Sequence, residues 1–142
     1  MPLSTTEAPR LYPALRYADA RAMIDWLQEA FGFTLHACYG DGDIVDHAQL
    51  ALGSSMIMLG TARDDNFCKI VGSPGSGGGK SIYIAVDDAD AAHERAKAAG
   101  AKIEEEPVDR DYGSREFICR DPEGNIWAFG TYWPKASEPA SP

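Results

Sequence analysis

The segment at residues 119–133, CRDPEGNIWAFGTYW, joins a turn to a strand that could carry a reactive side chain. Asp121 to Asn125 has turn composition, and residues 126–132 are apolar and aromatic, as in a buried strand. Chemistry at such a strand requires a side chain with a donor atom, such as His, Glu or Gln, aimed at a metal ion or a substrate. Whether this strand carries such a residue depends on the fold that positions it.

The cysteines and histidines form no recognisable motif. The chain has an odd number of cysteines, Cys38, Cys68 and Cys119, and no CxxC motif. This argues against a disulfide framework and a zinc knuckle. This pattern favours a reducing compartment, and the cytoplasm is the expected location. His47 and His93 lie in different segments, and we expect His93, within a helix, to be solvated. No Ser-His-Asp or Cys-His arrangement is visible from the spacing.

Composition and charge exclude several classes of function. The chain has 142 residues, 44% hydrophobic and 25% charged, which is typical of one globular domain. Its net charge of -9 argues against a nucleic-acid partner, since phosphate binding requires clustered Lys and Arg. The uncharged stretch near residues 70–79 is too short and too glycine-rich to span a membrane, and no signal peptide is expected. The glycine run has no flanking strand and helix, so it is not a phosphate loop.

Two segments of the chain share one plan. Residues 15–35 and 83–103 each contain a short apolar strand, then an Asp, and then a helix of about three turns that ends at a Gly. Three strand-like segments follow each helix, at 33–39, 44–52 and 55–59 in the first half and at 101–104, 115–120 and 126–132 in the second. The sequence therefore predicts an α+β fold with the order βαβββ twice.

The two predicted modules have approximate boundaries. They cover about 9–60 and 80–133 within a single domain at 9–133, and a flexible linker at 61–79 joins them. The last nine residues, 134–142, are expected to be a disordered tail. The first helix places Met23 and Leu27 on its apolar face, and the second presents small Ala side chains to its sheet.

The duplicated unit resembles the vicinal oxygen chelate superfamily, which includes glyoxalase I, bleomycin-resistance proteins and extradiol dioxygenases. Residues 16–33 and 83–103 are similar to its two strand-helix segments, and YGSREFICRDPEGNIWAFGTY at 112–132 is similar to its last hairpin. The resemblance covers about residues 9–133. It implies two curved mixed sheets that enclose a cleft for a small molecule. It also implies a homodimer, since relatives cover exposed sheet edges and apolar faces by pairing subunits.

Relatives with metal chemistry take one ligand from each of four strands, usually His, Glu or Gln. The equivalent positions in this chain are Tyr12, Gln49, Ser81 and Ala128. Ala128 has no donor atom, and Ser81 is a poor ligand unless ionised, so no metal and no other cofactor is predicted. Metal-dependent glyoxalase I or dioxygenase activity is therefore not expected. His47 would enter the site only if the strand register slipped by two residues.

Side chains that share a face with these positions line the predicted cleft. The ligand-binding candidates are Tyr12, Arg16, Gln49 and Tyr83, with Tyr112 and Arg115 near the mouth. Tyr12 and Tyr83 have a structural alternative as half-buried strand residues, and Arg115 has one as a surface residue. Arg16 needs a partner, which is either an internal carboxylate or an anionic ligand. In glyoxalase-like relatives an arginine at this place contacts a substrate carboxylate.

Two functions remain open. The first is a metal-free protein, similar to the bleomycin-resistance branch, that binds a small aromatic or cationic molecule in its cleft. The acidic net charge and the tyrosines favour it. The second is a lyase, isomerase or dioxygenase that acts on a small oxygenated metabolite, and Arg16 favours an anionic one. A tyrosine or His47 would then be the general base.

Overall fold

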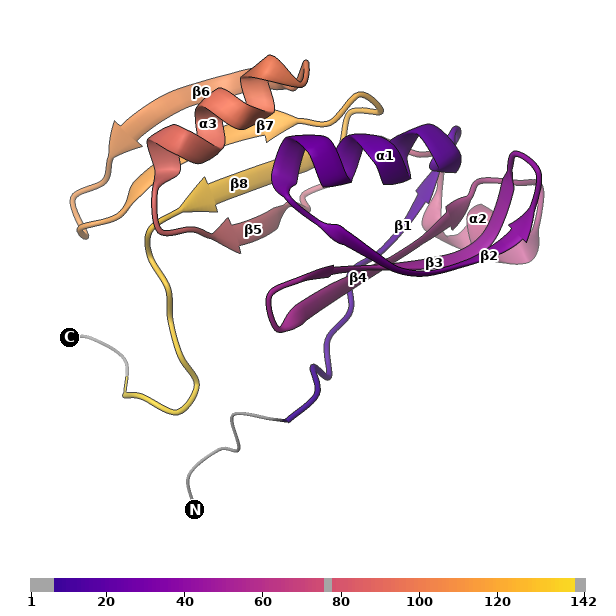
Figure 1. Ribbon diagram of the computed structural model, residues 1–142, viewed down its shortest axis with the longest axis horizontal. Helices are drawn as coiled ribbons and strands as arrows, with labels where there is room; N and C mark the ends of the chain where they lie inside the picture. The colour runs from indigo at the N-terminus through magenta and orange to yellow at the C-terminus, as the bar shows by residue number, and fades with distance from the viewer. Residues whose placement is uncertain (1–6, 76–77, 140–142) are drawn as a thin grey trace.

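The computed structural model describes residues 7–75 and 78–139 and contains two four-stranded mixed sheets (Figure 1). The first sheet has the order β1-β4-β3-β2 and the second β5-β8-β7-β6. The strands of the first sheet are β1 (Ala14–Tyr17), β2 (Thr34–Asp41), β3 (Ile44–Leu52) and β4 (Ser55–Thr61). Those of the second are β5 (Ile82–Ala85), β6 (Lys102–Asp109), β7 (Arg115–Arg120) and β8 (Ile126–Gly130).

Each sheet repeats the same pairing. Its first strand runs parallel to its last, β1 against β4 and β5 against β8, and the other neighbours are antiparallel. The helix between the first and second strands of each half makes the connection, as α1 (Ala20–Phe31) and α3 (Ala89–Ala98). The predicted α+β fold with a duplicated βαβββ unit in mixed sheets is confirmed.

Both helices start at an aspartate, as their sequences predict. The Asp19 carboxylate accepts a hydrogen bond from the Ala22 amide at 3.1 Å, and Asp88 accepts one from Ala91 at 3.0 Å. These caps satisfy N–H groups that have no partner within the helix. Gly32 ends α1 with a φ of 84°, a left-handed conformation that residues with a side chain rarely adopt.

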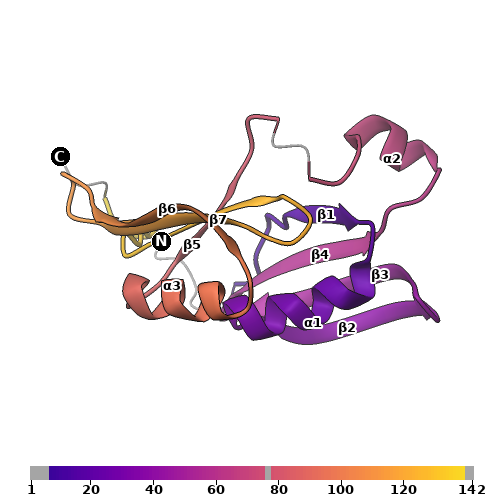
Figure 2. The same cartoon turned by 90° about the horizontal axis from the view of Figure 1, so that it is seen from above.

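One hydrophobic core joins the two halves. α1 and α3 lie next to each other on the same side of the molecule (Figures 1 and 2), and the Trp26 indole N–H donates to the Ala99 carbonyl at 2.7 Å. The Phe31 ring contacts Trp127 and Phe129 of β8, with centroids 5.0 and 4.9 Å apart. Trp127 is fully buried, as predicted. The helices therefore pack against one face of each sheet and leave the other face open.

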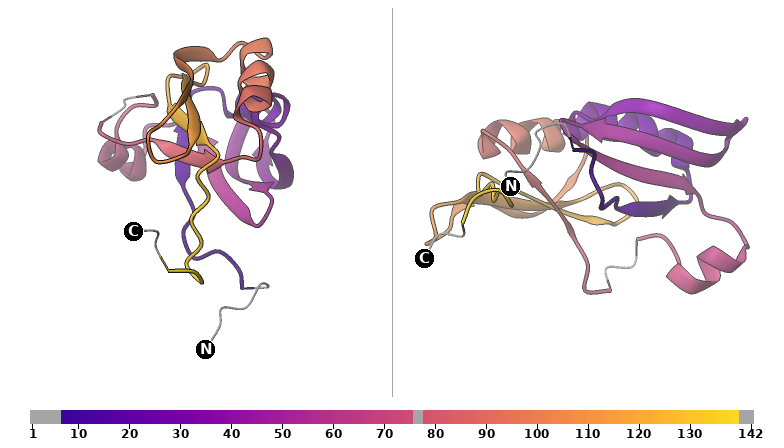
Figure 3. Two further views of the ribbon diagram at one scale, coloured as in Figure 1. Left: turned by 90° about the vertical axis from the view of Figure 1, so that its left-hand side faces the viewer. Right: turned by 90° about the horizontal axis from the view of Figure 1, so that it is seen from below.

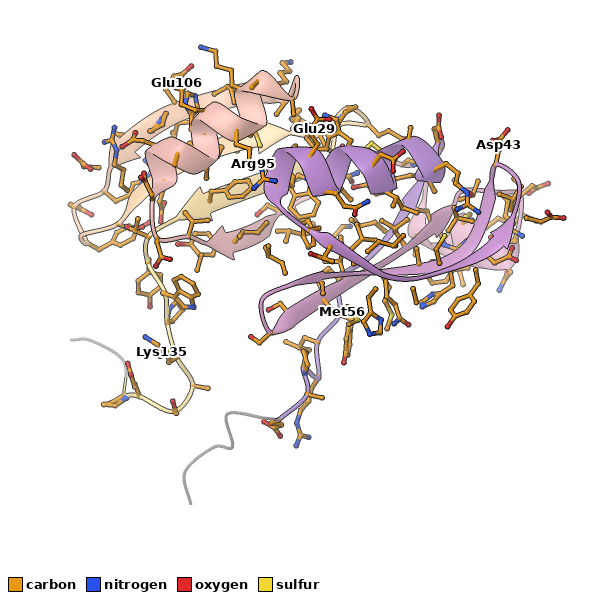
Figure 4. All side chains as sticks on the ribbon, viewed as in Figure 1. Glu29, Asp43, Met56, Arg95, Glu106 and Lys135 are labelled. Atoms are coloured by element: carbon orange, nitrogen blue, oxygen red, sulfur yellow. The ribbon has the colours of Figure 1, made fainter. Side chains whose placement is uncertain are left out.

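Polar contacts also cross between the halves. Figure 4 shows Arg95 extending from α3 toward the end of α1, where it donates to the Glu29 carbonyl at 2.7 Å. The Tyr17 hydroxyl donates to the buried Asp121 carboxylate at 2.7 Å, and the Trp127 indole N–H donates to the same oxygen at 3.0 Å. The DPEGN turn therefore contributes a buried structural acceptor.

One segment and one side chain differ from the sequence prediction. Residues predicted to be only a flexible linker contain a short helix, α2 (Asn66–Val71), which lies beyond the edge strand β1 (Figure 3). His93, predicted to be solvated, is only 5% exposed, and its ring packs edge-on against Phe117. The His93 ring contacts an aromatic side chain instead of solvent because α3 lies close to β7. Residues 134–139 contain no helix or strand, and the last three residues of the predicted tail lie outside the described part.

Candidate functional site

A hollow of about 110 Å³ opens on the first sheet, on the face that α1 does not cover. This volume has room for several water molecules or a small anion. Its lining comes from β1, β3, β4 and α2: Ala14, Leu15, Arg16, Asp46, His47, Met58, Leu59, Gly60 and Phe67. It combines apolar side chains with a cation, a carboxylate and an imidazole, the composition of a small-molecule site.

Gly60 allows the strands around the hollow to approach closely. It pairs with Arg16 across β1 and β4. A Cβ atom at Gly60 would lie 3.1 Å from the backbone oxygen of Asp46, so any larger residue would push β3 and β4 apart. The missing side chain keeps Arg16 on β1 and His47 on β3 in the lining of one hollow.

Arg16 is the cation of the hollow, and its side chain is 24% exposed. One terminal nitrogen, Nη1, donates to the Thr61 carbonyl at 3.3 Å and lies 3.9 Å from the Asp65 carboxylate. Within the described residues, Nε and Nη2 have no hydrogen-bond partner. The sequence predicted either an internal carboxylate or an anionic ligand as the partner of Arg16. The structure provides the carboxylate of Asp65, at a distance of 3.9 Å. Free donors remain for an anionic ligand.

Phe67 of α2 forms one wall of the hollow. The Arg16 guanidinium carbon lies 4.7 Å from the centre of the Phe67 ring, which is within cation–π range. The helix is held by Asp65, whose carboxylate accepts from the Cys68 amide at 2.8 Å. Hydrogen bonds from Cys68, followed by the charges of Arg16 and Arg63, keep the pKa of Asp65 below its usual value.

His47 and Gln49 share the open face of β3. His47 Nε2 lies 2.9 Å from Gln49 Oε1, and Gln49 Nε2 lies 3.0 Å from His36 Nδ1. The Tyr39 ring stacks on the His47 ring at 6.4 Å with an interplanar angle of 15°. His47 therefore enters the hollow in the register that places Gln49 on this face, because residues two apart on a strand point the same way. The predicted two-residue slip is not needed.

Two of the predicted tyrosines lie over the second sheet. The Tyr83 hydroxyl donates to the Tyr132 carbonyl at 2.7 Å, and the Tyr112 hydroxyl donates to Glu116 at 2.8 Å. Burial opposes ionisation of Glu116, but hydrogen bonds from Tyr112, Ser114 and Arg110 outweigh it and lower the pKa of this carboxyl. These side chains form a second polar group, separate from the lining of the hollow.

The other predicted ligand contacts lie in different places. Arg115, predicted as a ligand contact with a surface role as the alternative, forms ion pairs with Asp90 at 3.0 Å and with Asp109 at 3.1 Å. Tyr12 precedes β1, is half-buried and is not in the lining of the hollow. The structure thus brings Arg16 and Gln49 to one face and does not bring Tyr12, Tyr83, Tyr112 or Arg115 into the same hollow.

The four strand positions at which metal-binding relatives carry ligands do not fit a divalent ion. Ala128 has no donor atom, and the Gln49 amide is occupied by two histidines. Ser81 lies just before β5 in the second half, whereas Gln49 lies in the first sheet. In the part of the chain that the structure describes, no three His, Cys, Asp or Glu side chains are grouped as a metal site.

Comparison with known families assigns this architecture. Residues 11–129 match the Glyoxalase/Bleomycin resistance protein/Dioxygenase superfamily. The chain belongs to this superfamily. An uncharacterized protein of Mycobacterium bovis is 33% identical over 130 residues, which cover 86% of this chain and 82% of that protein. The resemblance predicted from the strand-helix segments and the last hairpin is therefore confirmed.

Solved structures that are similar to this chain support the fold. TioX from Micromonospora sp. ML1 is 28% identical, with a TM-score of 0.68 over 87% of this chain and 98% of that one. A glyoxalase/bleomycin resistance protein/dioxygenase family enzyme from Burkholderia phytofirmans PsJN is 24% identical, with a TM-score of 0.69. The alignment covers 84% of this chain and 94% of the Burkholderia enzyme, and this similarity concerns the fold alone.

Sequence reasoning missed Phe67 and admitted His47 to the site only through a change of strand register. Phe67 was assigned to a flexible linker, although Asp65 followed by Asn66 and an apolar residue is a helix-start signal. His47 was separated from Gln49, although the strand period of two places both on one face. Both signals were present in the sequence. The contact between Phe67 and Arg16 was not, because it joins segments about 50 residues apart.

Proposed function

We propose that the protein binds a small molecule in the hollow over the first sheet, without a catalytic metal. The observation that carries this proposal is Arg16, which lies in the hollow with two nitrogens that have no partner among the described residues. A guanidinium in an aromatic and apolar surrounding favours a ligand that has a carboxylate or phosphate group and an apolar part.

The local charge favours an anion over the cationic ligand that the net charge suggests. The net charge of -9 acts over the whole surface and is screened by salt. Arg16 acts at contact distance, and its neighbour Asp65 is 3.9 Å away, which leaves the ion pair long. The Asp46 carboxylate at the rim is already paired with Arg63 at 2.8 Å. An anionic group of the ligand therefore meets a cation whose own carboxylate partner is 3.9 Å away.

The tyrosines over the second sheet support a homodimer with a shared site. Tyr83 and Tyr112 are 40 and 59% exposed, so a large part of each ring is open to a partner. A second copy that places its second sheet over the hollow would cover these rings and extend the site with Tyr83 and Tyr112. Sedimentation at high micromolar concentration tests this association, and a monomer would contradict it.

A metal-independent isomerase or lyase is the second candidate. It is favoured by His47, because an imidazole in the same hollow as Arg16 could move a proton on a bound anion. The test is conversion of any ligand that binds, followed by NMR, with wild-type protein and with His47→Phe. Conversion that the variant retains would contradict the role of His47. Binding without conversion would leave the first proposal as the function.

Isothermal titration tests the binding proposal. A panel of aliphatic and aromatic carboxylates and phosphates is titrated into protein treated with EDTA, with Arg16→Gln as the variant and Arg10→Gln as the control. Arg10 is 85% exposed and pairs only with Glu7 nearby. We expect binding that only Arg16→Gln weakens, by about tenfold or more, because hydrogen bonds to charged groups contribute about 1.5–3 kcal/mol. Binding that requires added metal would contradict the proposal.

A cytoplasmic location is also proposed, and the cysteines support it. Cys38, Cys68 and Cys119 are all free thiols. A reducing compartment preserves such thiols. Among the described residues, no helix is both long and apolar enough to cross a membrane.

A further inference from the structure

The row of side chains His36, Gln49 and His47 runs along the open face of the first sheet and ends at the hollow. β2 has a register shift between Leu35 and Ala37, so that His36 is an extra residue opposite β3. A bulge of this kind re-aims a side chain. Here it brings His36 Nδ1 within 3.0 Å of the Gln49 amide, while Gln49 also contacts His47 at 2.9 Å.

The Gln49 amide determines which nitrogen of His47 carries the proton. Its Oε1 can only accept, so His47 Nε2 must be the donor. In this orientation of the amide its Nε2 can only donate, so His36 Nδ1 is the acceptor. A neutral imidazole has one N–H, and therefore His47 Nδ1 is left as a hydrogen-bond acceptor. In the described part of the chain this nitrogen has no partner.

The hollow therefore presents two complementary groups to a ligand. Arg16 on β1 offers N–H donors with a positive charge, and His47 on β3 offers a lone pair from the other side of Gly60 in β4. We infer that the hollow selects small carboxylates that carry a hydroxyl or N–H donor beside the carboxylate, with Arg16 binding the carboxylate and His47 Nδ1 accepting the donor's hydrogen. Gln49 and His36 are positioning residues that keep His47 in this tautomer. This inference rests on the proposed binding function.

The first measurement is the tautomer of His47. Long-range ¹H–¹⁵N correlation spectra of the full chain, recorded at a pH where the ring is neutral, distinguish the two nitrogens. We expect the Nε2–H form in the wild-type protein and in Gln49→Glu, whose carboxylate still accepts from His47. Gln49→Leu should give a mixture of both forms. A wild-type Nδ1–H form would overturn the inference, because the nitrogen left in the hollow would then be a donor.

The second measurement compares glycolate with acetate, two carboxylates that differ by one hydroxyl group. We expect wild-type protein to bind glycolate about fivefold more tightly, as one neutral hydrogen bond contributes about 0.5–1.5 kcal/mol. The ratio should fall to about one in His47→Phe and remain in Gln49→Glu. Tyr39→Phe keeps the stacked ring and is the control, for which we expect no change.

Three outcomes overturn the inference without deciding the binding function. They are equal affinities for glycolate and acetate in wild-type protein, a preference that His47→Phe retains, and failure of both anions while another member of the carboxylate and phosphate panel binds. If no member of the panel binds, the proposed function fails as well. Circular dichroism of His47→Phe separates loss of the acceptor from loss of the fold.

Discussion

The guanidinium of Arg16 lies over the ring of Phe67, with its central carbon 4.7 Å from the ring centre. Arg16 lies on β1, and Phe67 lies on the short helix between the two halves. This contact makes α2 part of the candidate site, although none of its residues is buried. A guanidinium presents its N–H donors in one plane, which favours a ligand that binds along the edge of that plane.

We predict that Phe67→Ala weakens carboxylate binding about fourfold and leaves the melting temperature unchanged. A cation–π contact at an exposed site contributes about 0.5–1 kcal/mol, and the ring is 43% exposed, so its removal opens no core cavity. Ile70→Ala is the matched control, because Ile70 lies on the same helix and is 74% exposed. Calorimetric titration measures the affinities. Equal losses in both variants would show that helix α2, rather than the ring, matters.

We predict that Tyr17→Phe lowers the free energy of unfolding by about 1.5–3 kcal/mol. The change removes the hydroxyl that donates to the buried Asp121 carboxylate at 2.7 Å, and hydrogen bonds to buried charged groups contribute this much. Urea unfolding measures the loss. Tyr39→Phe serves as the control, since Tyr39 is 62% exposed. A loss below about 0.5 kcal/mol would mean that Asp121 is satisfied without Tyr17.

Stability should also fall at alkaline pH because of Tyr17. Burial, followed by the Asp121 charge, raises the pKa of the Tyr17 phenol far above its ordinary value of 10.0. Below a pH of about 10 the phenol keeps its proton in both the folded and the unfolded state, so its contribution to stability is complete. Above a pH of about 10 only the unfolded state loses the proton, which lowers the free energy of unfolding by up to about 1.4 kcal/mol per pH unit. Urea unfolding between pH 9 and 11 should show a shallower decline in Tyr17→Phe.

Thiol reactivity should distinguish Cys119 from the other cysteines. Burial and then the Asp121 charge raise the pKa of the Cys119 thiol to about 12, and this side chain is fully buried. Cys38 and Cys68 are partly exposed. Native protein at pH 8 should therefore react with a thiol reagent at Cys38 and Cys68 and leave Cys119 unmodified until urea is added. Peptide mapping identifies the sites, and rapid labelling of Cys119 would contradict its burial.

The fold followed from the sequence to a large extent because its signals are local. The Asp and Gly residues at the ends of α1 and the apolar alternation of β8 act within a few residues, and they predicted both elements. The helix α3 face was also correct, with Ala89 and Ala96 buried. The error at His93 arose because an imidazole on a polar helix has no local mark of burial. Its contact with Phe117 depends on how α3 sits on the sheet.

The site followed only in part because its contacts are long-range. Strand period placed Arg16 and Gln49 on one face, and the structure adds His47 to the same face. The role of Tyr83 was inferred from strand period alone, which does not specify whether two sheets of one chain share a cleft. The bulge that aims His36 at Gln49 depends on pairing between β2 and β3, and no residue type in the sequence indicates this bulge.

The methyl group of Met58 offers the most direct test that the hollow binds a small molecule without a metal. Met58 lines the hollow, whereas Met23 is 3% exposed in the core and serves as an internal control. Protein labelled with ¹³C at the methionine methyl groups is stripped of metal with EDTA and titrated with the carboxylate and phosphate panel. The account predicts a saturable shift at Met58, none at Met23, and its loss in Arg16→Gln. A shift that appears only after a divalent metal is restored, or that leaves Met58 unchanged, would contradict it.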